Sequence, residues 1–202
     1  MKDYDVIVIG SGVGGLCTGS LLAHQGRSVL VVEQANRVGG CCSTYDHDGY
    51  KIDIGASIIE FASVIDSAFQ RMDTSFFNEV DLVPVDPTFT AKLYDGTEIS
   101  FPLDLQATER VFAEHAPEDL DGWKRYAETI EGFLQVALDG FFTTPAGTLG
   151  EAFNLFKNSP ALLKYGSLFA SSYEDVIRRF FTNERIIEAF SFHSFYAGLT
   201  PA

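Results

Sequence analysis

A run of glycines near the amino terminus has the spacing that lets a polypeptide backbone approach a pyrophosphate. The run fits the pattern G-x-G-x-x-G, and its six residues are Gly10, Ser11, Gly12, Val13, Gly14 and Gly15. In this pattern Gly10 permits a tight turn, Gly12 leaves room for the pyrophosphate, and Gly15 lets a helix pack closely on a strand. The amino terminus of the following helix adds free N–H groups and the positive end of its dipole. The run therefore predicts a dinucleotide site.

A carboxylate stands where such a site binds the adenosine ribose. Glu33 follows a second apolar run, at the expected distance from the glycines, and Gln34 is included with it in the predicted site. A carboxylate there can accept hydrogen bonds from both ribose hydroxyls, and it disfavours a 2′-phosphate, which argues against NADP. The structural alternative is a glycine-rich turn that only packs a helix on a sheet. The full context favours binding.

The segments around the glycines are those that a dinucleotide site requires. Residues 5–9 and 28–32 are continuous apolar runs, typical of parallel strands buried on both faces. Between them, residues 16–25 are predicted to form a helix that Gly26 closes. Together these segments predict one right-handed βαβ unit.

Further along the chain the pattern predicts short elements and then helices. A short extended stretch, an amphipathic helix and a hairpin are expected at residues 49–55, 58–72 and 88–101. The hairpin signal is the turn Asp95-Gly96. Pro117 is placed at the first position of a helix that runs to about Leu138, with acidic residues at 118, 119 and 121 in its first turn. Candidate N-caps of three later helices are Thr148, Ser172 and Asn183.

Composition excludes several classes of partner. The net charge of −14 repels phosphate backbones, so no nucleic acid is expected. Three cysteines, of which Cys41 and Cys42 are adjacent, indicate reduced thiols in a cytoplasmic protein. Their spacing does not suggest zinc, and no metal site is predicted. The uncharged stretch 6–23 is too rich in glycine and hydroxyl groups for a membrane span or a secretory signal.

The sequence after Glu33 resembles a known family. Residues 34–43 contain the pair Gly39-Gly40 and resemble the second glycine motif of the glutathione-reductase-like flavoproteins, especially the amine oxidase and phytoene desaturase branch. The resemblance implies FAD as the cofactor, with Gly39, Gly40 and Cys41 near its diphosphate. Many members carry Arg where this chain has Cys41, so the charge compensation that Arg gives a phosphate is lost. Cys41 and Cys42 are expected to be small buried spacers rather than a redox pair.

Two further stretches carry the resemblance. Residues 49–57 resemble the desaturase segment whose backbone lies near the isoalloxazine, which adds Gly55 and Ala56 to the predicted cofactor site. Asp53 in this stretch is expected to fix the loop by local hydrogen bonds. Residues 173–195 closely resemble bacterial phytoene desaturases, and His193 among them is given a structural role. Phe is dense from residue 133 onward, and most of these side chains are expected to be core.

The resemblance implies an α/β fold and a redox function. Residues 1–75 are expected to be the amino-terminal part of a Rossmann-like FAD-binding domain, and residues 76–202 part of an α+β substrate domain with Phe-rich helices. The implied reaction moves a hydride from an allylic carbon of a long apolar polyene to flavin N5. No catalytic residue is assigned, and peripheral membrane contact is implied. Because only two parallel strands are evident, the fold is expected to be incomplete and the 202 residues inactive alone.

Two alternatives are retained within the same superfamily, a carotenoid isomerase-like and an amine oxidase-like flavoprotein. A third belongs to another class, the non-catalytic GDP-dissociation inhibitors, which share this fold. Those proteins degrade the glycine fingerprint, whereas all its glycines are intact here.

Overall fold

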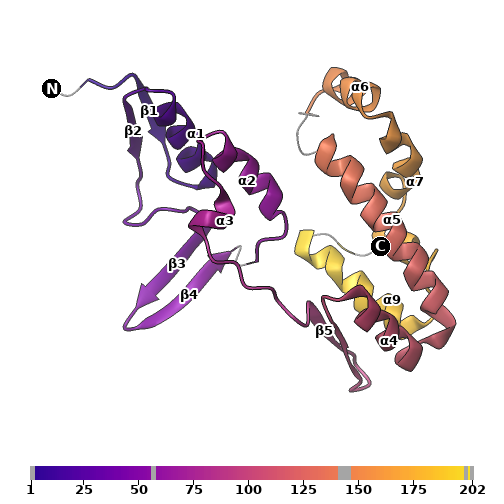
Figure 1. Ribbon diagram of the computed structural model, residues 1–202. Coiled ribbons are helices and arrows are strands. Elements are labelled where there is room, and N and C mark those ends of the chain that lie inside the picture. Colours follow the sequence, from indigo (N-terminus) through magenta and orange to yellow (C-terminus); the bar gives the residue numbers. More distant parts are fainter. Residues whose placement is uncertain (1–2, 56–57, 141–146, 198–199, 201–202) are drawn as a thin grey trace. The chain divides into compact units, whose positions relative to one another are not determined.

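The computed structural model describes residues 3–55, 58–140, 147–197 and 200 (Figure 1). Ala56, one of the predicted cofactor residues, lies outside the described residues. The chain divides into two compact units, residues 1–82 and residues 83–202. The division falls seven residues after the expected domain boundary, and the assignment of a function to each domain stays a prediction.

The first unit opens with the expected βαβ arrangement. Strand β1 (Val6–Ile9) pairs in parallel with β2 (Val29–Val32), and Val6 lies opposite Val29. Helix α1 (Val13–His24) connects them and lies along the sheet (Figure 1). It begins three residues before the predicted start, because the last two glycines of the fingerprint adopt helical geometry despite their poor helix propensity.

The expectation that β1 is buried on both faces is wrong. Its side chains alternate between the two faces of the sheet, as in any strand. Val6 and Val8 are half-buried on the side of α1, whereas Ile7 is 59% exposed and Ile9 is 88% exposed. The apolar run correctly predicts a parallel strand, but α1 covers one face only.

The rest of the first unit consists of a hairpin and two short helices. Strands β3 (Cys42–His47) and β4 (Tyr50–Gly55) are antiparallel, and the turn between them is Asp48-Gly49, both with positive φ. Strand β4 confirms the predicted extended stretch. Helix α2 (Ala62–Gln70) is shorter than predicted and is joined to α3 (Phe76–Glu79) by the buried carboxylate of Asp66, which accepts from the Ser75 hydroxyl and the Phe76 N–H, both at 2.8 Å.

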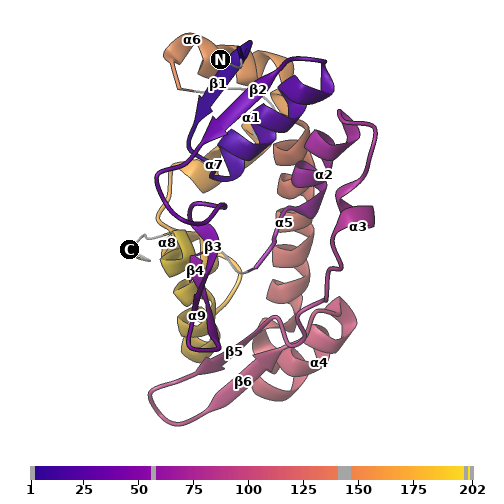
Figure 2. The same cartoon turned by 90° about the vertical axis from the view of Figure 1, so that its left-hand side faces the viewer.

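The second unit begins with the predicted hairpin and continues as helices. Strands β5 (Phe89–Lys92) and β6 (Glu98–Phe101) are antiparallel, and β6 contacts α4 (Leu105–His115), as Figure 2 shows. The turn Asp95-Gly96 is confirmed, with the Asp95 carboxylate accepting the Thr97 N–H at 2.9 Å. Pro117 opens a 3₁₀ turn (Pro117–Asp119), after which α5 runs over Leu120–Asp139.

Five further segments follow, and the N-caps of three of them are those predicted. They are α6 (Leu149–Asn158), the 3₁₀ helix η2 (Pro160–Tyr165), α7 (Gly166–Phe169), α8 (Tyr173–Ile177) and α9 (Glu184–Ser191), before a last 3₁₀ helix at Phe192–Ala197. Thr148, Ser172 and Asn183 each accept a backbone N–H at the start of α6, α8 and α9. None of the helices in the described part of the chain has the length and apolarity needed to cross a bilayer.

Aromatic side chains make up most of the core of this unit. Phe112 stacks between Trp123 and Phe181, with ring centroids 5.2 and 5.4 Å away, and Phe190 packs against all three. Phe112, Phe181 and Phe190 are at most 3% exposed. Not every Phe is core, however, since Phe153 is 69% exposed.

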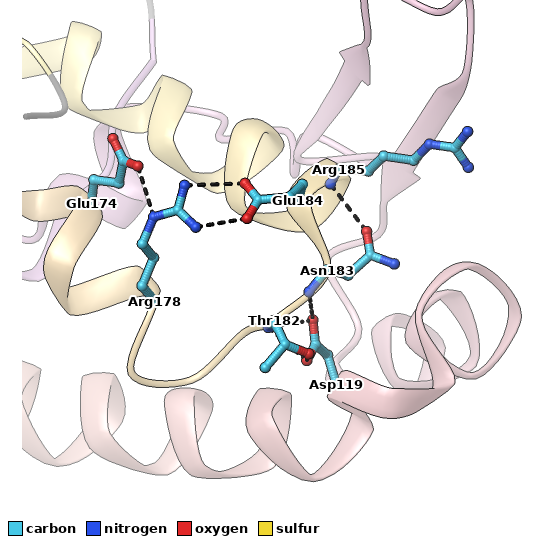
Figure 3. Close-up of polar contacts among 7 residues, drawn as sticks. All are labelled: Asp119, Glu174, Arg178, Thr182, Asn183, Glu184 and Arg185. Carbon is cyan, nitrogen blue, oxygen red and sulfur yellow. Dashed lines mark hydrogen bonds and ion pairs between the residues drawn. The ribbon is translucent and has the colours of Figure 1, made fainter.

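A buried carboxylate fixes the start of α9 against the start of α5 (Figure 3). Asp119 is 2% exposed and accepts hydrogen bonds from the Thr182 N–H, the Thr182 hydroxyl and the Asn183 N–H, the shortest at 2.8 Å. Beside it, Arg178 donates both terminal guanidinium nitrogens to the Glu184 carboxylate at 2.8 and 3.0 Å. These bonds to Arg178 lower the pKa of Glu184.

Candidate dinucleotide site

The turn between β1 and α1 has the shape of an anion cradle. Gly10 has a φ of +98°, and its N–H donates to the Val32 carbonyl at 2.7 Å. Gly12 is the N-cap of α1, and no side chain caps the helix there. The first turn of α1 also contains no acidic residue. The N–H groups at this helix start and the positive dipole end are therefore not neutralised by a carboxylate of the same turn.

The structure itself requires glycine at two of the three fingerprint positions, Gly10 and Gly15. A methyl group on Gly15 would overlap the Gly10 carbonyl oxygen and lie 3.1 Å from its carbon, so helix and strand approach too closely for any side chain. Gly10 needs its positive φ for the turn. At Gly12, by contrast, φ is −67° and a methyl group would meet its nearest neighbour, Gly40 Cα, only at 4.0 Å. The protein itself has room for a Cβ at residue 12, and a bound pyrophosphate would approach the backbone in this space.

Glu33 lies beside this turn and is held in one orientation. Its Oε2 accepts from the Ser11 N–H at 2.7 Å and from the Ser11 hydroxyl at 2.9 Å, while its Oε1 accepts the Ala35 N–H at 2.9 Å. The hydrogen bonds from the Ala35 N–H and from Ser11 lower the pKa of Glu33 to about 2. The carboxylate is therefore ionised at neutral pH and able to accept further hydrogen bonds. Gln34, its predicted neighbour in the site, is exposed.

The second glycine pair lies directly against the first turn. The Gly39 N–H donates to the Ser11 carbonyl at 2.8 Å, and Gly39 and Gly12 form a bridge of parallel type. A methyl group on Gly40, whose φ is +59°, would lie 3.1 Å from Gly12 Cα. The structure thus brings together two glycine motifs that the sequence separates by more than twenty residues.

A serine that the sequence reasoning missed fixes this second loop. Ser43 is 7% exposed, and its hydroxyl donates to the Gly40 carbonyl at 2.7 Å. The Arg37 Nε donates to the same hydroxyl oxygen at 3.2 Å. The signal in the sequence was weak, a single serine three residues after the glycine pair, which is a spacing typical of side-chain hydrogen bonds to loop carbonyls.

The remaining predicted residues surround this loop. Gly55 has a φ of +108°, and a methyl group there would overlap the Cys41 carbonyl oxygen. Cys41 and Cys42 are both exposed, so the expectation that they are buried spacers is wrong. The Asp53 carboxylate accepts the Thr44 hydroxyl at 3.0 Å, in line with the local role expected of it.

His193 lies in the second unit and packs among aromatic rings. Its ring centroid is 4.4 Å from that of Phe89 and 5.8 Å from that of Phe190. This packing against core side chains agrees with the structural role expected of it.

Comparisons with known proteins agree with this geometry. A family described as "NAD(P)-binding Rossmann-like domain" matches residues 8–72. A phytoene dehydrogenase of Streptomyces griseus is 28% identical over 199 residues, which are 98% of this chain and 38% of that protein. A phytoene desaturase of Fusarium fujikuroi is 31% identical over 97% of this chain and 34% of that protein. A zeta-carotene-forming phytoene desaturase of Myxococcus xanthus is 28% identical, over 97% and 37%.

A solved structure shows the same fold. It belongs to a putrescine oxidase double mutant made in a structure-based redesign of cofactor binding, and its TM-score is 0.52. Sequence identity is 17%, over 91% of this chain and 35% of that one, so this likeness concerns the fold alone.

The chain spans little more than a third of the length of the curated relatives that it matches. The sequence match covers nearly all of this chain, which confirms the resemblance inferred from the motifs. Residues 8–72 form a Rossmann-like dinucleotide-binding domain, and the chain is a homologue of the phytoene desaturases and dehydrogenases over almost its whole length.

Proposed function

We propose that the chain binds FAD and is part of an FAD-dependent oxidoreductase that desaturates a long apolar polyene of the phytoene class. The observation that carries the proposal is the room at Gly12, where an added Cβ would meet only Gly40 Cα, at 4.0 Å. There the backbone leaves room that no protein atom needs, beside an N-terminus of α1 without an acidic residue in its first turn. The ionised Glu33 lies next to the same turn.

The residues present fit a dinucleotide. The diphosphate would lie over Gly12 and the first N–H groups of α1, with the Gly39-Gly40 loop beside it, and the adenosine ribose would meet Glu33. Cys41 contributes no charge to a diphosphate, so the helix dipole and the backbone N–H groups carry more of the attraction here than in relatives with Arg. Gly55 holds the loop of Cys41 close to the β3–β4 hairpin.

The relatives' names support a polyene substrate, since they are phytoene desaturases and dehydrogenases from bacteria and fungi. A bound flavin would supply the hydride acceptor for such a desaturation: an allylic carbon would lose a hydride to it and the neighbouring carbon a proton to a base or solvent, which would leave a new double bond. A hydrocarbon offers no polar group, so a site can hold it only by apolar contact and shape. We assign no catalytic base among the described residues.

A glycine substitution tests the cofactor site. Gly12→Val is expected to fold but to purify without flavin, because the side chain fills the space that the pyrophosphate needs. Gly150→Val in α6 is the matched control, since a Cβ there meets nothing within 4 Å. Flavin absorbance between roughly 350 and 500 nm reports the bound cofactor. A full flavin spectrum in Gly12→Val would contradict the assignment of this site.

A cell-based assay tests the substrate class. The gene that encodes this chain, expressed in full in cells that accumulate colourless phytoene, is expected to give a coloured polyene or a shifted isomer. Unchanged phytoene together with oxidation of a polar amine by the purified protein would move the assignment to the amine oxidase branch. A variant with Gly12→Val serves as the control in the same cells.

We also propose that one surface of the second unit contacts a membrane. Helix α6 and η2 contact each other and expose Phe153 and Leu163, at 69% and 66%, with Lys157 and Lys164 nearby in sequence. Apolar side chains flanked by lysines favour an anionic lipid surface. Co-sedimentation with phosphatidylglycerol vesicles should fall for Phe153→Ser with Leu163→Ser, whereas equal sedimentation of this variant and the wild type would contradict the contact.

A further inference from the structure

We propose that a pocket in the second unit binds the head group of phosphatidylethanolamine, next to the surface that α6 and η2 form. The inference rests on the proposed membrane contact and names the lipid that this part of the protein would recognise. The chemistry that the pocket selects is a phosphodiester with a primary ammonium group close to it.

The pocket lies between α5, η2, α7 and the turn that follows α8, and its volume is about 290 Å³. This volume is at the lower limit for ligand sites, so the pocket suits a small polar group rather than a long polyene. Five of its lining residues carry the argument: Glu128, Lys164, Tyr165, Ser167 and Arg179.

Tyr165 fixes one wall of the pocket. It is 7% exposed, and its ring centroid is 5.6 Å from that of Phe133 in α5. A Cβ on Gly132, also in α5, would overlap the Tyr165 hydroxyl, so η2 packs on α5 without a gap at this point. The pocket is therefore formed before any ligand binds, as is usual for ligand sites.

Two cations line the pocket, and neither forms an ion pair within the described part of the chain. The terminal nitrogens of Arg179 donate to the hydroxyls of Ser167, at 3.2 Å, and Ser171. A guanidinium has five N–H donors, so three remain for a ligand. The Lys164 ammonium lies 5.4 Å from the centroid of the Tyr165 ring, a contact that uses none of its three donors. Both cations can therefore donate to the oxygens of a phosphate.

Glu128 brings the opposite charge to the same pocket. It is exposed on α5 and has no ion-pair partner among the residues that the structure describes. Its carboxylate repels a bare anion such as inorganic phosphate, whereas a zwitterion meets both charges, with its phosphate on Arg179 and Lys164 and its ammonium on Glu128. Phosphoethanolamine carries these two groups two carbons apart. Phosphocholine does not fit as well, because its ammonium has no N–H to donate to Glu128.

The neighbouring surface favours a lipid as the carrier of this head group. Lys164 follows Leu163 in η2, which is 66% exposed, and η2 contacts α6, where Phe153 is 69% exposed. A head group in the pocket would thus have apolar side chains near it for the acyl chains. The net charge of −14 argues against a general attraction to an anionic membrane, so recognition of the lipid has to be local.

Vesicle composition provides the test. Two sets of vesicles hold the same share of phosphatidylglycerol and differ in the remainder, which is phosphatidylethanolamine or phosphatidylcholine. The protein, expressed in full from the gene that encodes this chain, should co-sediment about threefold more strongly with the phosphatidylethanolamine set, the effect of one exposed ion pair. Glu128→Gln should abolish this preference without preventing binding. Glu131→Gln, in the same helix but outside the pocket lining, is the matched control and should behave as the wild type.

The outcomes separate the inference from the membrane contact on which it rests. Equal sedimentation of the wild type with the two sets would overturn the inference and leave the contact standing; calorimetry with glycerophosphoethanolamine would then show whether the pocket takes a soluble zwitterion instead. A lack of sedimentation with both sets would overturn the membrane contact and the inference together. A preference that persists in Glu128→Gln would also overturn the inference, because bilayer packing rather than the pocket would then account for it.

Discussion

Substitution of Gly15 by alanine gives the sharpest test of the packing between α1 and β1. A Cβ at Gly15 would lie well inside 3.0 Å of the Gly10 carbonyl oxygen, a separation that real Cβ atoms essentially never show, and 3.5 Å from the Val8 side chain. The close neighbour is backbone, so the turn itself must move. Overpacking of this kind costs about 1–3 kcal/mol, and the better helix propensity of alanine returns about 1 kcal/mol at most. The overlap with a backbone atom puts the cost at the upper end of that range, so we expect Gly15→Ala to destabilise α1 by about 2 kcal/mol.

Gly14→Ala is the matched control in the same turn of the same helix. A methyl group there meets nothing within 4 Å, so the substitution should be neutral or stabilise α1 by up to about 1 kcal/mol. Hydrogen exchange of a peptide that covers α1 measures local opening, and a difference of about 3 kcal/mol between the variants corresponds to roughly a hundredfold difference in exchange. Equal exchange in the two variants would refute the reasoning, because it would mean that the turn accommodates the added carbon freely.

Three further predictions concern named contacts. Asp119→Asn should lower the free energy of unfolding by about 2 kcal/mol, measured by urea titration of tryptophan fluorescence, because the amide keeps only one acceptor oxygen and turns an NH2 donor toward a buried donor at the start of α9. Asp121→Asn, in the same helical turn, should change it little. The pKa of Glu33 falls from 4.5 to about 2 on folding. The ionised carboxylate therefore stabilises the folded state fully above pH 4.5, and this contribution is lost as the pH falls toward 2. Glu33→Gln should remove this part of the pH dependence of stability, measured by acid titration with circular dichroism. Gly122→Ala should lower the melting temperature, since its methyl group would overlap the Phe180 carbonyl oxygen, and Gly150→Ala should not.

The sequence was sufficient for the motifs whose chemistry is local. The fingerprint glycines and Glu33 could be predicted because strand, turn and helix follow one another directly, and the acid ends the next strand. The hairpin around Asp95-Gly96 was predicted for the same reason. The hairpin around Asp48-Gly49 was predicted only in its second strand, although it carries the same turn signal. Its first strand contains Cys42, Ser43 and Thr44, which lack an apolar alternation.

It could not be predicted which polar groups, far apart in the sequence, form hydrogen bonds with one another. Asp119 and Asp121 look alike in the sequence, since both stand in the first turn of an expected helix, where an acid is favourable for the dipole. In the structure Asp119 is buried and binds residues 182 and 183, whereas Asp121 is exposed. The same holds for Ser11, whose position within the fingerprint indicates a ligand contact until its two donors are found on Glu33. The spacing of residues in the sequence thus predicts which helices and strands form. A hydrogen bond between distant residues depends on how the fold places those helices and strands next to one another. Ser11 stays a predicted site residue, and its hydrogen bonds to Glu33 follow only from the structure.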